Sequence, residues 1–335
     1  MVQYLERVQK KYRKTKGNTG VFVAFFFMFF FIFRDIILSV LVELIPSKSG
    51  TGKKGSILFI EPIQQGYGDM FFQTGLFENW KADGYQVGVL TSNDHAQILE
   101  NNHDIGSIYT WSLSHTLEIM KKPFIVVGLG RDTFKETLFM LLLIRSTKIV
   151  FDKNLKIWRD TFSEVGTTLA WQRLSERYIG TNFNSHKPKI CFSSNEEDEI
   201  YKSKNLTRIG VVLGVETHSK EFRGTEKLIS AIGKAKHDIF LFGKGKLSIK
   251  IPRSAANFVN KLSYRRTIVE IAKCGVLIGP EGSLTQIAST LCSKVIIVEG
   301  AERFKKNTHP FFLGRAALLI SPTVAETIKR ALQHL

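Results

Sequence analysis

Cysteine is scarce in this 335-residue sequence, and several familiar signatures are missing. The three cysteines, Cys191, Cys274 and Cys292, are widely spaced and show no metal-ligand pairing, which argues against a disulfide framework and favours a reducing compartment. The N-terminus lacks a small-residue cleavage site of the signal-peptide kind, so we do not expect its removal. A G-x-G-x-x-G dinucleotide fingerprint is also missing, because Phe71 stands where its last glycine is required.

Acidic residues are too few to balance the basic ones. The chain has 47 Lys and Arg against 30 Asp and Glu, a net charge of +17, in a composition (44% apolar, 23% charged) that is typical of a globular protein. This surplus favours an anionic partner, whether phosphate, nucleic acid or an acidic membrane surface. No RNA- or DNA-binding motif accompanies the charge, so we expect no nucleic-acid partner.

The first 46 residues combine a basic arm with an apolar stretch. The arm precedes the apolar residues 21–45, which the charged pair Arg34 and Asp35 interrupts. The stretch is long enough to cross a bilayer, which takes ~20 residues. The central charged pair and the basic residues on both flanks instead favour a segment that lies in the membrane plane. We predict a membrane-associated segment and leave both topologies open.

After a Gly/Ser/Lys-rich linker at 47–56, short apolar runs alternate with helical patterns, which predicts parallel sheets covered by helices on both faces. In the first half we expect strands at 57–61, 86–91, 107–111, 124–129 and 148–151, and helices at 69–82, 94–101, 113–121 and 132–145. In the second half we expect strands at 208–214, 238–243, 256–262, 275–279 and 294–300, and helices at 225–236, at 264–273 and from Ser283.

This alternation predicts an α/β protein with two Rossmann-like domains, 57–186 and 187–321, that face each other across a cleft. The hydrophobic membrane-associated segment 1–46 precedes them, and the last helix, in 322–335, is expected to pack back on the first domain. Ligands of doubly wound folds bind at the carboxyl ends of strands, and three such ends carry unusual residues here.

The first of these strand ends is IEPIQQGYGDMFFQTG, residues 60–75. Gly66 and Gly68 would let the chain approach a ligand closely, on the acceptor side of the cleft. Asp69 stands at the start of the following helix. Its carboxylate is either a helix cap that accepts backbone N–H bonds or a catalytic base, and the pattern alone does not separate the two.

The second strand end is LGVETHSKEFRG, residues 213–224. Thr217, Ser219 and Lys220 suit a diphosphate, because hydroxyls donate hydrogen bonds and lysine offers a mobile positive charge. The alternative is a solvated loop. His218 has no neighbours at metal-ligand spacing, so we expect no metal site.

The third strand end is LIGPEGSLTQIAST, residues 277–290, where a strand passes through glycines into a helix. The unpaired N–H groups of a helix start, at Gly282 and Ser283, form a natural phosphate site, and Gln286 lies one turn further along. Glu281 would repel a phosphate, but it could accept hydrogen bonds from sugar hydroxyls or cap the helix. The three ends together would suit a nucleotide-diphosphate sugar.

Residues 57–109 and 260–300 resemble two parts of glycosyltransferase family 9, the lipopolysaccharide heptosyltransferases. The first part, beginning ILFIEPIQQGYGDMFF, is similar to the family's opening strand followed by Gly-Asp at a helix start. The second part contains GPEGSLTQIAST and resembles the family's C-terminal signature, in which Asp, Ser or Thr, and Gly precede a His-Leu-Ala helix. The resemblance extends over about 57–300.

This resemblance implies a GT-B architecture and the inverting, metal-independent transfer of heptose from an ADP-activated donor. Carried over residue by residue, it makes Asp69 the base that activates the acceptor and Lys220 the diphosphate lysine. Glu281 takes the place of the family's Asp and is one methylene longer, and Gln286 replaces the signature His.

We therefore expect a membrane-associated glycosyltransferase of the bacterial cell envelope, with no cofactor or metal beyond an ADP-heptose-like donor. Its expected partners are that nucleotide-diphosphate sugar, a lipopolysaccharide or other glycolipid or oligosaccharide acceptor, and an anionic membrane surface. The expected location is the cytoplasmic face of the inner membrane. The alternative is a catalytically silent nucleotide-sugar-binding scaffold of the same fold, which the changes at Glu281 and Gln286 favour.

Overall fold

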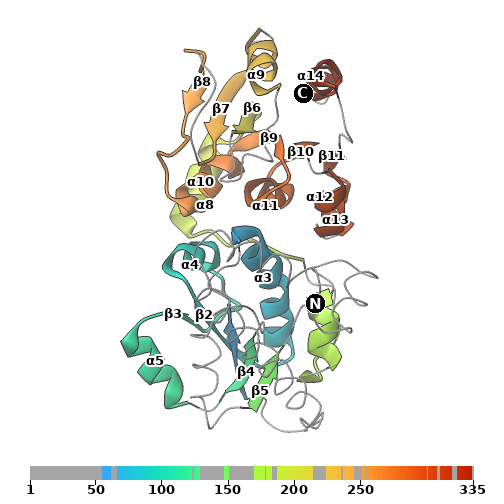
Figure 1. The fold of residues 1–335 in the computed structure, drawn as a ribbon. Helices are drawn as coiled ribbons and strands as arrows, with labels where there is room; N and C mark the ends of the chain where they lie inside the picture. Colours follow the sequence, from blue (N-terminus) through green and yellow to red (C-terminus); the bar gives the residue numbers. More distant parts are fainter. Residues whose placement is uncertain are drawn as a thin grey trace, which may run out of the picture.

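The protein consists of two α/β halves, which lie one above the other in Figure 1. The computed structural model describes residues 55–61, 66–122, 124–128, 147–150, 170–177, 179–182, 187–213, 224–234, 237–244, 251–253, 255–299, 301–307, 310–318 and 323–333. The basic arm, the apolar segment 21–45 and the expected helix at 132–145 lie outside these residues. Among the described helices, none has the length and apolar character needed to cross a membrane.

The N-terminal half is built on five parallel strands in the order β3-β2-β1-β4-β5. These are β1 (Ser56–Ile60), β2 (Gln86–Thr91), β3 (Ser107–Thr110), β4 (Ile125–Gly128) and β5 (Thr147–Val150). Three helices connect the strands, namely α3 (Tyr67–Ala82), α4 (Asn93–Leu99) and α5 (Leu113–Met120). The first strand in the chain, β1, lies at the centre of the sheet, as a Rossmann-like fold requires.

The C-terminal half repeats this plan with six parallel strands in the order β11-β10-β9-β6-β7-β8. The strands are β6 (Asn205–Val212), β7 (Asp238–Phe242), β8 (Ala255–Asn257), β9 (Cys274–Pro280), β10 (Lys294–Glu299) and β11 (Ala316–Leu318). The helices are α8 (Ser194–Ser203), α9 (Thr225–Lys234), α10 (Tyr264–Ala272), α11 (Ser283–Leu291), α12 (Ala301–Asn307), α13 (Pro310–Leu313) and α14 (Val324–Gln333). This is the doubly wound strand order of dinucleotide-binding domains.

The apolar runs of the sequence form strands because both faces of each sheet are covered. In β1 the residues Ile57, Leu58 and Phe59 are fully buried. Phe59 packs at the edge of the Phe77 ring, with ring centroids 5.4 Å apart, and next to Trp80 from α3. The burial of α3 on this sheet therefore fixes where its N-terminus lies.

The two halves share one hydrophobic core at their boundary. Tyr264 and Ile268 of α10 and Ile287 of α11 belong to the same buried cluster as Ile57 and Phe71 of the N-terminal half. Helix α11 packs on α3, and α10 packs on α4. A fully buried isoleucine contributes roughly 1.5–3 kcal/mol, so this contact stabilises one particular arrangement of the two halves.

A buried arginine adds polar contacts next to the same boundary, one of which crosses it. The Arg265 guanidinium donates to Glu196 of α8 through Nε (2.8 Å) and Nη2 (2.6 Å), and Nη2 also donates to the Cys191 carbonyl at 2.8 Å. The Arg265 backbone N–H donates to Gln97 Oε1 of α4 at 3.0 Å. The hydrogen bond from Arg265 lowers the pKa of Glu196 to about 2.

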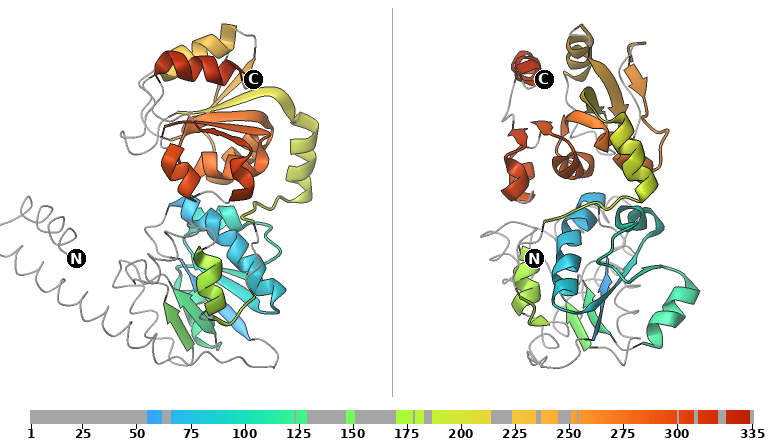
Figure 2. Two further views of the ribbon diagram at one scale, coloured as in Figure 1. Left: turned by 90° about the vertical axis from the view of Figure 1, so that its right-hand side faces the viewer. Right: turned by 180° about the vertical axis from the view of Figure 1, so that it is seen from behind.

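The chain end differs from its prediction. Helix α14 packs against α9 in the C-terminal half, at the top of both views in Figure 2, and does not return to the first domain as expected. The elements α8, α12, α13 and β11 were not predicted from the sequence. The last three are too short to carry a clear periodic pattern, and α8 has no buried residue that would mark an apolar face.

We predict that Glu196→Gln lowers the free energy of unfolding by about 2–3 kcal/mol at neutral pH, the usual value of a charged hydrogen bond. The folded pKa of Glu196 is about 2, below its ordinary 4.5, so the ionised carboxylate stabilises the fold above pH 4.5. That contribution disappears as the pH falls towards 2, and the gap between wild type and variant should close there. Urea unfolding across this pH range measures the effect.

The matched control is Asp198→Asn on the same helix. Asp198 pairs with Lys202 at 3.6 Å, but both side chains are 75% exposed. Exposed pairs contribute less than about 1 kcal/mol, so this variant should unfold like the wild type at every pH. An equal effect of both substitutions would show that the contact between Arg265 and Glu196 contributes no more to the free energy of unfolding than an exposed ion pair.

Candidate active site

Two predicted strand ends meet at the boundary between the halves. Strand β1 ends at Ile60 and leads to α3, and β9 ends at Pro280 and leads to α11. The starts of α3 and α11 face each other, and a Cβ atom built on Gly68 would lie 3.5 Å from the Ser283 Cα. The sequence therefore brings together residues 66–69 and 281–286, which are more than two hundred positions apart, at the carboxyl ends of both sheets.

The geometry at the start of α3 bears on the two roles predicted for Asp69, helix cap and catalytic base. The N-cap position belongs to Gly66, which is exposed and in extended conformation, and it makes no side-chain cap. Asp69 lies in the first turn of the helix, where its own N–H donates to the Gly66 carbonyl at 3.0 Å. Its carboxylate is therefore not the N-cap, although its negative charge suits the positive end of the helix.

A buried carboxylate stands beside Asp69. Glu61 follows β1 directly and is 1% exposed. One of its oxygens contacts His95 Nδ1 of α4 at 2.7 Å, and the other accepts a hydrogen bond from the Thr91 hydroxyl. Burial raises the pKa of Glu61; His95 and Thr91 oppose this rise, and the negative charge of Asp69 adds to it. The charge of Asp69 is thus close enough to act on Glu61.

Two tyrosines close the boundary next to this pair. The rings of Tyr67 from α3 and Tyr264 from α10 stack with centroids 3.7 Å apart and planes 10° apart. The Tyr67 ring also lies against His95, 4.6 Å away and at 66°. Burial raises the pKa of the Tyr264 hydroxyl, and the Ser283 side chain beside it partly offsets this rise. Side chains of both halves therefore form one continuous wall.

The start of α11 is built for close approach. Gly282 occupies its N-cap position with extended backbone, and its N–H donates to the Thr285 hydroxyl oxygen at 3.0 Å. Ser283 begins the helix and is partly exposed, while Gln286 is 1% exposed. Glu281, just before the cap, is 7% exposed. Gly282 and Ser283 are thus placed at a helix start that suits an anion, with Glu281 beside them.

Some predicted site residues cannot be placed. Thr217, Ser219 and Lys220 of the second strand end lie outside the described residues. Among the residues that are placed, no group of three or more His, Cys, Asp and Glu side chains is arranged to hold a metal ion. The described site consequently comprises the first and third strand ends.

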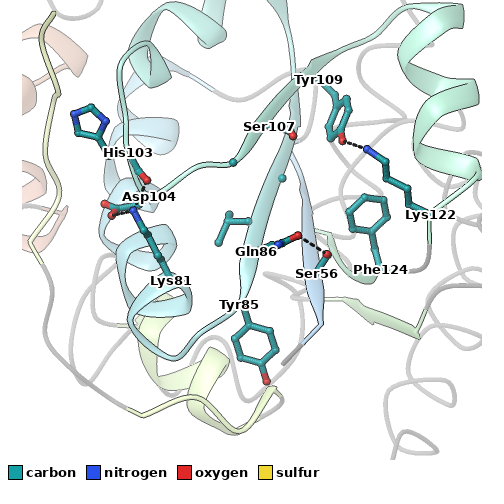
Figure 3. A pocket seen from close by; sticks show the side chains of 13 residues that line it. Ser56, Lys81, Tyr85, Gln86, His103, Asp104, Ser107, Tyr109, Lys122 and Phe124 are labelled. Carbon is teal, nitrogen blue, oxygen red and sulfur yellow. Dashed lines mark hydrogen bonds and ion pairs between the residues drawn. The ribbon is translucent and has the colours of Figure 1, made fainter. Parts of the chain in front are cut away.

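A cavity of about 440 Å³ lies at the opposite edge of the N-terminal sheet, as Figure 3 shows. It is lined by the first residues of three strands, Ser56, Gln86 and Ser107, together with Lys81 and Lys122. The amino ends of parallel strands are not where doubly wound folds bind their ligands. We therefore place the candidate active site at the domain boundary and not in this cavity.

Sequence reasoning missed His95, Tyr67 and Tyr264 and gave Glu61 no role. One signal was available for Glu61, because an acidic residue directly after the apolar run ILFI is unusual for a buried strand end. His95 lies 34 residues further along and meets Glu61 only through the pairing of β1 with β2.

Comparisons with known proteins agree with the fold. No family model matches the sequence, and no curated protein does either. A family 9 glycosyltransferase structure from Veillonella parvula matches 85% of this chain and 92% of its own, with 14% identity and a TM-score of 0.60. The E. coli ADP-heptose LPS heptosyltransferase II matches 83% and 98%, with 14% identity and a TM-score of 0.61.

A third structure, E. coli heptosyltransferase WaaC with ADP, matches 83% of this chain and 98% of its own, with 11% identity and a TM-score of 0.60. The predicted fold is thereby confirmed: this chain has the two-domain fold of the family 9 heptosyltransferases. At these identities the likeness concerns the fold alone.

We predict that Gly68→Val lowers the free energy of unfolding by about 1–3 kcal/mol through overpacking, because its branched methyl groups would meet Ser283. Gly68→Ala is the matched control, since a Cβ atom there makes ordinary contact at 3.5 Å. It should leave stability unchanged or raise it slightly, as alanine favours helix. Urea unfolding of both variants tests the contact, and equal stability of the two would contradict the close approach of α3 and α11.

Proposed function

We propose that this chain is a glycosyltransferase that moves heptose or a related sugar from a nucleotide-diphosphate donor to a lipopolysaccharide or similar surface-glycan acceptor. One observation carries the proposal: the start of α11 and the first turn of α3, with Asp69, face each other at the carboxyl ends of both sheets. The structural neighbours named above as heptosyltransferases support the same choice.

Donor binding is assigned to the C-terminal half. The N–H groups at the start of α11 carry partial positive charge and would receive the diphosphate, with the Ser283 hydroxyl as a further donor. Glu281 beside them would accept hydrogen bonds from hydroxyls of the sugar or ribose. On the basis of the sequence, we also assign phosphate contacts to the loop that carries Thr217, Ser219 and Lys220. No metal takes part, because the helix start and the lysine would neutralise the leaving diphosphate.

Acceptor activation is assigned to Asp69. A sugar hydroxyl attacks well only when a base takes its proton in the transition state. Asp69 is partly exposed in the first turn of α3, so its carboxylate is accessible to an acceptor that enters the boundary. Attack from that side with departure of the diphosphate towards α11 would invert the anomeric centre. Gly66, where a side chain would meet open space, leaves room for the acceptor near this carboxylate, whereas Gly68 is in contact with Ser283.

The pair of Glu61 and His95 is assigned a positioning role. A carboxylate on Nδ1 favours the imidazole tautomer that carries its proton there and fixes the ring orientation. The ring in turn supports Tyr67, which precedes Asp69 on the same turn of α3. We place the enzyme at the cytoplasmic face of the inner membrane, held by the apolar segment 21–45 and by its net charge of +17 towards anionic lipid.

Binding of nucleotide diphosphates tests the donor site. We expect ADP and ADP-sugars to raise the melting temperature, because a ligand that binds only the folded state stabilises it, by about 2.7 kcal/mol at 100 times Kd. UDP-, GDP- and CMP-sugars serve as comparison ligands. Ser283→Asp should abolish this shift, since a carboxylate at the helix start repels phosphate. Because Ser283 also lies against Gly68 and Tyr264, the melting temperature of this variant is measured without ligand as well, and only the shift caused by the ligand is compared.

Ser194→Asp is the matched control. Ser194 is the first residue of α8, as Ser283 is of α11, and it is exposed. This variant should bind ADP like the wild type. If Ser283→Asp also keeps the full shift, the diphosphate does not bind at α11 and the proposed site is wrong.

The proposed base makes a separate prediction. Asp69→Asn should reduce transfer by ~10²–10⁴, the usual contribution of a positioned general base, because an amide cannot take the acceptor proton. Binding of ADP should remain unchanged. The free energy of unfolding should fall by less than about 1 kcal/mol, because Asp69 is not the N-cap and only its charge near the positive end of α3 is lost. ADP release from ADP-heptose with truncated lipopolysaccharide as acceptor measures transfer.

Asp94→Asn controls for the loss of an acidic residue from a first turn, here in α4 and exposed. It should retain full transfer. If Asp69→Asn also retains most of its transfer, Asp69 is not the base. If the wild type binds ADP but neither transfers nor hydrolyses any donor, the alternative of a silent nucleotide-sugar-binding scaffold holds.

A further inference from the structure

Helix α5 exposes an apolar stripe that no described residue covers. Leu113 is 76% exposed, Leu117 50% and Met120 39%. Their spacing of four and three residues puts all three on one face of the helix. They are three of the six large apolar side chains that the described part of the chain leaves exposed, and the other three are distributed over other elements. A concentration of this kind on one surface helix indicates an interaction site.

The charges around the stripe suit an anionic surface. Lys121 and Lys122 follow Met120 directly, and both are exposed. The only acidic residue of the helix, Glu118, is already engaged with Lys122 Nζ at 2.8 Å. Lys121 follows Leu117 by one helical turn, so a positive charge borders the stripe. Apolar side chains flanked by lysines are the composition of helices that lie in a lipid interface.

The position of α5 links it to the apolar N-terminal segment. Ser56, where β1 begins, lines the same cavity as Lys122 and Phe124 at the end of α5, as Figure 3 shows. Residues 47–55 connect this point to Pro46, and even fully extended they span at most roughly 30 Å. A segment 21–45 held by a membrane therefore keeps this side of the N-terminal half close to the lipid. In Figures 1 and 2, α5 lies towards the end of that half that is farther from the C-terminal half.

We propose that the stripe of Leu113, Leu117 and Met120 is a second membrane-docking element, which inserts into the headgroup boundary of an anionic bilayer while Lys121 contacts lipid phosphate. This inference rests on the proposed membrane association but not on the transfer chemistry. Two attachments, the segment and α5, fix the orientation of the N-terminal half relative to the lipid. One attachment alone would leave that half free to rotate relative to the membrane.

A fluorescent label on the full-length chain tests the docking. Leu117→Cys carries an environment-sensitive dye, and Tyr201→Cys on α8, 87% exposed, is the matched control position. Cys191 is replaced by Ser so that the label is unique, since Cys274 and Cys292 are buried. Vesicles of phosphatidylcholine with phosphatidylglycerol should shift the emission at position 117 to the blue, and nitroxide-labelled lipid should quench it. Position 201 should respond to neither.

Two further measurements test whether docking depends on the charge of Lys121 and on anionic lipid. Lys121→Glu in the labelled chain should weaken the response at position 117, and so should vesicles of phosphatidylcholine alone. The proposal is overturned if the chain floats with the vesicles while the label at 117 stays in water, an outcome that leaves the proposed transferase function untouched. It is equally overturned if the chain does not bind vesicles, or if the shift appears without lipid and grows with protein concentration, since the stripe would then join protein copies.

Discussion

The candidate site depends on the hydrophobic core that the two halves share. Neither half alone would complete the wall around Asp69, because Tyr264, Ile268 and Ile287 come from the second half and pack into the core of the first. The side chains at this boundary are buried apolar groups, and exposing them to water would be unfavourable in proportion to their area. Core packing therefore determines the distance between the starts of α3 and α11. It also determines the relative positions of the residues proposed to act there.

The polar contacts at the boundary differ from the apolar packing in what they contribute to stability. Arg265 is buried and directs its guanidinium to Glu196 and to the Cys191 carbonyl, while its backbone N–H contacts Gln97 of the other half. Buried ionic contacts of this type contribute modestly to net stability but penalise arrangements in which one partner is left alone. The apolar residues thus supply most of the favourable energy, and the hydrogen bond from Arg265 to Gln97 adds a directional contact between the halves.

The fold was largely predictable from the sequence because parallel sheets with covered faces leave continuous apolar runs. The run ILFI, predicted as a strand, lies in β1, and the predicted strand GVLIG forms the centre of β9. The start of α3 was misplaced by two residues because Gly66, the actual N-cap, gives no side-chain signal. The short strand β11 and the helices α12 and α13 before it were not predicted, since their few residues carry no clear period.

The site was predictable only in part, for a different reason. Asp69 and Ser283 were found separately because each follows a strand end, but their mutual approach depends on tertiary packing that periodicity does not encode. The direction in which α14 turns is likewise decided by the face that α9 offers it, and not by the pattern of α14 itself. The contact between Glu61 and His95 required the register of β1 against β2, which places residues 34 positions apart side by side.

The two carboxylates of the site illustrate how burial divides roles between like groups. Both oxygens of Glu61 are engaged, one by Thr91 and one by His95, so it has no accessible oxygen left for an incoming hydroxyl. Asp69 stands in the first turn of a helix at the boundary, on the wall opposite Ser283. An in-line displacement needs the base and the leaving phosphate on opposite sides of the reacting carbon. In the proposed reaction Asp69 at the start of α3 would be the base and the start of α11 would receive the phosphate. Because Gly68 and Ser283 are in contact, the sugar would have to bind beside that contact, within reach of both helix starts.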